Sequence, residues 1–132
     1  MRILGAIVSV ALCLSPSLGY AALEAQIVDK DCWVELYEDD DFDRDDPFLR
    51  LQGPAQSATL DNLEGKDWGN DIESIIMGPN AYMKAYDRRD FKGNEMAFVP
   101  NQRVKDLGKF DMANAIDSFK LTCGKGSEPT SR

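Results

Sequence analysis

The chain has 132 residues, of which 23 are acidic, 15 are basic and none is histidine, so its formal net charge is −8. This length allows one domain, and 43% hydrophobic with 29% charged residues is an ordinary globular composition. Without histidine, Ser-His and Cys-His catalytic pairs and histidine-ligated zinc are excluded. The acidic balance argues against nucleic acid or anionic lipid as a partner. We therefore expect a binding or structural module with no enzymatic activity.

The first 21 residues have the layout of a secretory signal peptide. Arg2 gives a positive start, an uncharged apolar run extends over residues 3–14, and Gly19 and Ala21 are small residues suited to cleavage near Ala21. The apolar run is too short to span a bilayer. The alternative to a signal peptide is a buried N-terminal helix. We expect a secreted or periplasmic protein with no membrane segment after cleavage.

Cleavage would leave 14 basic residues against 23 acidic ones, a net charge of −9, and two cysteines, Cys32 and Cys123. We expect a short lead over residues 22–31, a domain over 32–123 and a flexible tail over 124–132. An even cysteine count in an exported protein suggests a disulfide, which would tie the two ends of the domain together. The alternative is two separate thiols.

Internal repetition is the strongest signal in the chain. Residues 70–75, Asn-Asp-Ile-Glu-Ser-Ile, return 44 positions later at 114–119 as Asn-Ala-Ile-Asp-Ser-Phe. Upstream, residues 37–42 return 49 positions later at 86–91, and both copies read Tyr, four mostly charged residues, Phe. Because the order is kept across two separate blocks, we expect a duplicated unit with an insertion in the first copy.

Each unit is predicted to be β-structure. Apolar residues alternate with a period of two over 33–37 and 82–86, and turn residues such as Gly-Pro and Lys-Gly-Asn separate the runs. Ser57–Leu63 and Arg103–Leu107 are the two segments that could each form a helical turn. Eight short strands in two matched sets of four predict an all-β, single-domain, two-sheet sandwich with Greek-key connections.

At this point the chain resembles the beta-gamma crystallin family, whose paired units each open with an aromatic residue, four residues, an aromatic residue, one residue and a glycine. Residues 86–93 meet this pattern in full, whereas residues 37–44 have Arg44 where the glycine belongs. The glycine supplies a positive φ, so either Arg44 is strained or the acidic loop reshapes the turn. Ser74 and Ser118 also match the family. The resemblance implies Greek-key units at about 32–78 and 81–123.

The resemblance also implies calcium binding, because many microbial members hold Ca²⁺ between a loop of one unit and the opening hairpin of the other. One site would join Asn70, Asp71 and Ser74 to the second hairpin, and the other would join Asn114, Ala115 and Ser118 to the first. The hairpin ligands are Asp87 and Arg89 for the first site, and Glu38 and Asp40 for the second. At Ala115, Arg89 and Asp40 the ligand would be the backbone carbonyl.

Calcium prefers hard oxygen ligands, which these residue types supply. The alternative is structural: the asparagines form turns and the serines pin the folded hairpins. The acidic segment over residues 38–46 holds seven acids in nine positions and imitates the start of an EF-hand loop at Asp41, Asp43 and Asp45. Because Asp46 stands where that loop needs glycine, we expect a solvated loop, with a weak calcium or basic-partner site as the alternative.

The leading prediction is a secreted calcium-binding module with a structural or protective role, stabilised by Ca²⁺ between its two Greek keys. The alternative is a small secreted inhibitor or toxin on the same scaffold, with Pro47-Phe48 at the tip of its binding loop. The sequence does not identify which protein or glycan this module contacts.

Overall fold

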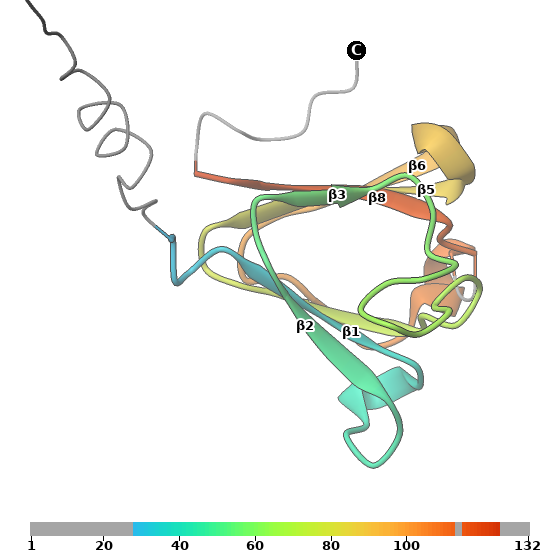
Figure 1. The fold of residues 1–132 in the computed structure, drawn as a ribbon. Helices are drawn as coiled ribbons and strands as arrows, with labels where there is room; N and C mark the ends of the chain where they lie inside the picture. The colour runs from blue at the N-terminus through green and yellow to red at the C-terminus, as the bar shows by residue number, and fades with distance from the viewer. Residues whose placement is uncertain (1–27, 113–114, 125–132) are drawn as a thin grey trace, which may run out of the picture.

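The computed structural model describes residues 28–112 and 115–124 (Figure 1). The predicted signal peptide, Asn114 and the tail after Gly124 lie outside these residues. The described residues include three short 3₁₀ segments: η1 (Asp40–Phe42), η2 (Arg89–Phe91) and η3 (Leu107–Phe110). The strands are β1 (Trp33–Tyr37), β2 (Phe48–Gln52), β3 (Ala55–Ser57), β4 (Ser74–Met77), β5 (Ala81–Arg88), β6 (Lys92–Phe98), β7 (Arg103–Val104) and β8 (Ser118–Cys123).

The eight strands form two antiparallel sheets that face each other, in the orders β2-β1-β4-β7 and β3-β8-β5-β6 (Figure 1). Each unit gives three strands to one sheet and one edge strand to the other. Thus β3 pairs with β8 of the second unit, and β7 pairs with β4 of the first. The predicted all-β, two-sheet sandwich of eight strands is confirmed, and neither unit completes a sheet by itself. No helix among the described residues has the length and apolarity needed to cross a membrane.

The exchanged edge strands correct one sequence expectation. Neither Ser57–Leu63 nor Arg103–Leu107 begins as a helical turn, because Ser57 ends β3 opposite Phe119 and Arg103 begins β7 opposite Ile76. The 3₁₀ turn comes later, at Leu107–Phe110. Pairing across the two units outweighs the weak local preference of these short segments.

The core lies between the sheets and follows the predicted period of two. Val34 and Leu36 of β1, and Met83 and Ala85 of β5, are buried against side chains of the opposite sheet. The intervening positions on β1 and β5 lie on the outer faces of the sheets.

The two opening hairpins are built alike. Tyr37 meets Phe42 edge-on with ring centroids 5.8 Å apart, and Tyr86 meets Phe91 in the same way at 5.9 Å. Both phenylalanines and the aspartates before them adopt left-handed backbone conformations.

The hairpins then diverge at the glycine position of the family pattern. Gly93 has a φ of 85°, and a Cβ there would collide with the Asp87 carboxylate. The backbone of Arg44, by contrast, is not in the left-handed region. Its guanidinium instead bonds to Glu35. The acidic loop therefore reshapes the turn in the first unit, and Arg44 is not strained.

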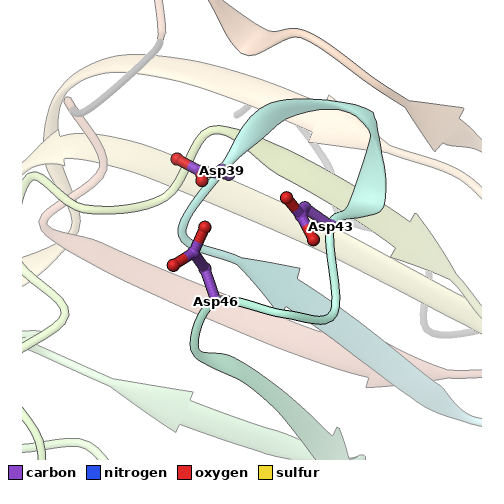
Figure 2. Close-up of side chains that lie close together, drawn as sticks. All are labelled: Asp39, Asp43 and Asp46. Carbon is purple, nitrogen blue, oxygen red and sulfur yellow. The ribbon is translucent and has the colours of Figure 1, made fainter.

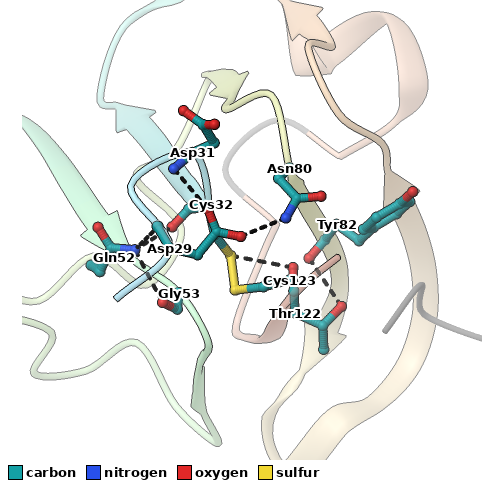
Figure 3. Close-up of a disulfide and its surroundings, with 9 residues drawn as sticks. All are labelled: Asp29, Asp31, Cys32, Gln52, Gly53, Asn80, Tyr82, Thr122 and Cys123. Carbon is teal, nitrogen blue, oxygen red and sulfur yellow. Dashed lines mark hydrogen bonds between the residues drawn. A yellow bond between two sulfur atoms is a disulfide. The ribbon is translucent and has the colours of Figure 1, made fainter. Parts of the chain in front are cut away.

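A disulfide joins Cys32, just before β1, to Cys123, at the end of β8, with their Cα atoms 5.5 Å apart (Figure 3). The Gln52 side-chain amide beside it donates to the carbonyl oxygens of Asp29, Cys32 and Gly53. The predicted pairing is confirmed, and it links one sheet covalently to the other.

Candidate metal sites

Both serines of the repeated loops bond to the hairpin of their own unit. Ser74 Oγ donates to the Asp39 carbonyl at 2.5 Å and accepts from the Phe42 N–H at 3.1 Å. Ser118 Oγ donates to the Arg88 carbonyl at 2.6 Å and accepts from the Phe91 N–H at 3.0 Å. Each hydroxyl is therefore used within its own unit, because β4 pairs with β1 and β8 pairs with β5. This corrects the expectation that each serine lies at the hairpin of the other unit.

Asp71 and Glu38, which the sequence assigns to different sites, share one lysine. Lys66 Nζ lies 3.3 Å from Asp71 Oδ2, 3.8 Å from Glu38 Oε2 and 3.3 Å from the carbonyl oxygen of Asp67. It also lies 4.4 Å from the centre of the Trp68 ring. We call this arrangement the Lys66 cradle. An ammonium group thus contacts oxygens of the kind that a hard cation would bind.

A second group of charged side chains lies at the hairpin of the second unit. The Arg89 guanidinium forms an ion pair with the Asp61 carboxylate. A methyl group placed on Gly69 would lie 3.2 Å from Asp67 Oδ1, 3.6 Å from Asp117 Oδ1 and 3.7 Å from Asp61 Oδ1, so acids of both units gather around this glycine.

Residues 58–61 connect the segment just before the first repeated loop to the hairpin of the second unit. The N–H of Asp90 bonds to the Ala58 carbonyl, and the N–H of Trp68 bonds to the Leu60 carbonyl.

The remaining expected ligands also have local roles. The Asp87 carboxylate accepts hydrogen bonds from the Asn94 backbone and side chain at 2.8 and 2.9 Å. Asn70 adopts a left-handed turn conformation, with a φ of 65°. The Asp40 carbonyl accepts from the Asp43 N–H, and the Ala115 N–H donates to Met112. Of the expected ligands, the side-chain oxygens of Ser74, Ser118, Asp71 and Asp87 therefore already have protein partners in this structure.

A different group of acids does converge. One carboxylate oxygen from each of Asp39, Asp43 and Asp46 lies within 4.8 Å of the others. Figure 2 shows the three side chains extending from successive parts of the loop between β1 and β2 toward a common space. We call this group the hairpin cluster.

The hairpin cluster differs from the neighbouring acids in its pairing. Glu35, Asp61 and Asp71 each have a lysine or arginine partner. In the described part of the chain, no lysine or arginine forms an ion pair with Asp39, Asp43 or Asp46. Negative charge is therefore concentrated at these three residues without an ion pair in the described chain to compensate it.

Proximity of these acids changes how Asp39 binds a proton. A hydrogen bond with Asp46 raises the pKa of Asp39 to about 6, and burial and the charges of Asp46, Glu73 and Asp43 act in the same direction. The sequence points to this loop through its density of acids, but the EF-hand spacing selects Asp41, Asp43 and Asp45. The fold brings together a different set, because Asp41 and Phe42 adopt left-handed conformations between Asp39 and Asp43.

Comparison with known proteins gives a consistent picture of the fold. No family model matches the chain, and no curated protein matches its sequence. A solved structure from work on the evolution of the eye lens beta-gamma-crystallin domain fold superposes with a TM-score of 0.64 at 19% identity, covering 77% of this chain and 96% of that one. An archaeal beta-gamma-crystallin gives 0.55 at 16% identity, with 69% and 98% covered.

Two clostridial structures add a comparison that involves metal. A beta-gamma-crystallin domain from Clostridium beijerinckii gives a TM-score of 0.55 at 20% identity, covering 67% of this chain and 95% of that one. A clostrillin double mutant with two introduced histidines, solved in complex with nickel, gives 0.56 at 19% identity, with 68% and 97% covered. The fold inferred from the paired hairpins and serines is confirmed: this chain has the beta-gamma crystallin fold.

Proposed function

We propose that this chain is a secreted structural module that binds calcium at the hairpin cluster. The observation that carries the proposal is the convergence of Asp39, Asp43 and Asp46 within 4.8 Å, with no ion pair to a lysine or arginine of the described chain. Bringing three carboxylates together without a counter-charge is unfavourable, and a bound divalent cation would relieve it. The predicted export supports calcium as the ion, since extracellular modules bind it at about 10⁻⁴–10⁻³ M.

Ligand chemistry also favours a hard cation. The cluster offers up to six carboxylate oxygens, and calcium takes six to eight oxygen ligands in flexible geometry. Nickel, which the clostrillin mutant binds, suits imidazole, and the mutant carries two introduced histidines where this chain has none. Oxygen ligands alone favour calcium or magnesium over a transition metal.

Calcium would act by stabilising the fold. The cluster lies in the loop that joins β1 to β2, and the Ser74 hydroxyl bonds to the carbonyl of its first member, Asp39. An ion bound to the folded loop alone would add about 2.7 kcal/mol of stability when calcium is one hundred times its dissociation constant. This is a large share of the stability of a domain this size.

Calorimetric titration of the mature protein tests the proposal. We expect binding heat at millimolar calcium and a rise in Tm, both lost in the double variant Asp43→Asn/Asp46→Asn. The matched control is Asp41→Asn/Asp45→Asn, which removes the same charge from the same loop and leaves the cluster intact. Absence of heat and of a Tm shift in the unmodified protein would reject the proposal. So would equal calcium binding by the two double variants.

The inhibitor or toxin alternative requires a free hydrophobic tip at Pro47-Phe48. The Phe48 side chain is 39% exposed, but its ring stacks on Tyr37 with centroids 5.5 Å apart, and the Arg44 guanidinium lies 4.7 Å from its centre. Because Phe48 is engaged by the sheet and by Arg44, this contact set does not favour the alternative.

A further inference from the structure

We infer that Lys66 is a resident counter-cation, which neutralises the junction between the first hairpin and the first repeated loop in place of a divalent ion. The sequence pattern suggests calcium ligands at Glu38 and Asp71. The structure joins these two residues through one ammonium group. The inference concerns the Lys66 cradle and does not depend on calcium binding at the hairpin cluster.

The position of Glu38 is the first support. Its Oε2 atom is buried and has no hydrogen-bond partner, while Lys66 Nζ lies 3.8 Å away. An uncompensated carboxylate oxygen out of contact with water is destabilising. Lys66 is the cation that forms an ion pair with this group, so it supplies the missing compensation.

The rest of the cradle holds the ammonium in place. Asp71 Oδ2 and the Asp67 carbonyl each lie 3.3 Å from Nζ. The Trp68 ring, whose side chain is almost fully buried, lies 4.4 Å away and attracts the ammonium through its π face. Two carboxylates, a carbonyl and an aromatic face together fix one positive charge between Glu38 of the hairpin and Asp71 of the loop.

The presence of this charge has a consequence for calcium. The same oxygens are of the type that calcium binds, but a divalent ion near them would be repelled by the ammonium and would have to displace it. Lys66 therefore makes this junction independent of calcium. Removing the charge of Lys66 while keeping the length of its side chain would leave two unneutralised carboxylates, and calcium could then compensate them.

The test uses the mature protein with Asp43→Asn/Asp46→Asn as background, so that the hairpin cluster cannot respond. We expect calcium to leave the Tm of this background unchanged. Adding Lys66→Met should lower the Tm by about 4–8 °C in the presence of a chelator. Millimolar calcium should restore most of that loss, and magnesium should restore less. Lys66→Arg, which keeps the charge, should match the background in both conditions.

A further variant separates charge from packing. If the loss arises from the unpaired buried carboxylate, adding Glu38→Gln to Lys66→Met should recover stability without calcium and weaken the calcium response. The inference is overturned if Lys66→Met leaves the Tm unchanged. It is also overturned if Glu38→Gln gives no recovery, or if calcium raises the Tm of the background while Lys66 is intact. Calcium binding by the protein with an intact cluster is measured separately, so either proposal can fail alone.

Discussion

Ser74 and Ser118 make the same pair of hydrogen bonds in the two units. Each hydroxyl, fully buried, donates to a carbonyl at the start of its hairpin and accepts from the N–H of a phenylalanine, Phe42 or Phe91. Both phenylalanines adopt left-handed conformations, which are unfavourable for a bulky residue. The serines thus hold the strained turns closed, and this is the structural role that the repeat preserves.

Ser74→Ala and Ser118→Ala should each lower the free energy of unfolding by about 1–3 kcal/mol, because each leaves a backbone donor and acceptor without its partner. The two losses should be similar, because the two hydroxyls make matching pairs of hydrogen bonds. Urea denaturation in the presence of a chelator measures both losses. Values below about 0.5 kcal/mol would contradict the assigned role.

Gly53→Ala tests how tightly the disulfide packs. A methyl group on Gly53 would lie 2.5 Å from Cys32 Sγ and 3.1 Å from Cys123 Sγ. The φ of Gly53 is not in the left-handed region, so the expected loss of about 1–3 kcal/mol arises from overpacking. In the Cys32→Ala/Cys123→Ala background, itself destabilised by about 2–5 kcal/mol, the loss should shrink because the sulfurs are absent. An equal loss in both backgrounds, measured by chemical denaturation, would show that the sulfurs are not the cause.

The central strands could be predicted from the sequence, whereas the edge strands could not. Val34 and Leu36, like Met83 and Ala85, alternate with outward residues because each strand has one face in the core. By contrast, β7 has only two residues, and its pairing partner belongs to the other unit. No local pattern encodes such a long-range exchange, so propensity alone suggested a turn.

The candidate site shows a similar division. The density of acids at 38–46 marks the right loop, but side-chain direction there depends on the left-handed residues Asp41 and Phe42. Lys66 is separated from Glu38 by a long stretch of chain, and only the fold brings their side chains together. A motif match depends only on spacing along the chain. It therefore cannot show that Lys66, which lies outside the motif, neutralises the expected ligand Glu38.

Glu35 should stabilise the outer face of the first sheet. Its carboxylate accepts from the Tyr37 hydroxyl at 2.6 Å and forms ion pairs with Arg44 and Arg50 at 3.2 and 3.3 Å. Glu35→Gln should lower the free energy of unfolding by about 1–2 kcal/mol, a value reduced by the exposure of both arginines. Glu95→Gln, at the more exposed partner of Lys84 in the other sheet, is the matched control and should cost less.

Tyr37 provides a second readout of the same group. Burial, followed by the hydrogen bond and charge of Glu35, raises the pKa of Tyr37 above its usual 10.0. Its stabilising contribution is therefore complete below pH 10 and is lost as pH rises through the higher folded-state value. Glu35→Gln should lower the pKa of Tyr37, as measured by an absorbance titration of tyrosinate. An unchanged pKa would show that Glu35 does not act on this hydroxyl.

Asp39 should make both stability and calcium affinity depend on pH. Its folded-state pKa of about 6 lies above the usual 3.8, so the folded protein holds this proton more tightly than the unfolded chain. The contribution is fully present below about pH 4 and is lost as pH rises through about 6. The groups that raise the pKa are Asp46 and Asp43 in the loop and Glu73 next to Ser74.

Protons and calcium should therefore compete at the hairpin cluster. Calcium affinity, measured by calorimetry, should be lower at about pH 5 than at about pH 7, because a proton on Asp39 must leave before the carboxylate can bind the ion. Asp46→Asn weakens the hydrogen bond that contributes most to the shift and removes the charge of Asp46. NMR titration should therefore give a lower pKa for Asp39, and the loss of stability between about pH 4 and 6 should become smaller. If calcium binds equally well at both pH values, or Asp46→Asn leaves the pKa of Asp39 unchanged, then Asp46 does not act on Asp39 as stated and the three carboxylates do not form one cation site.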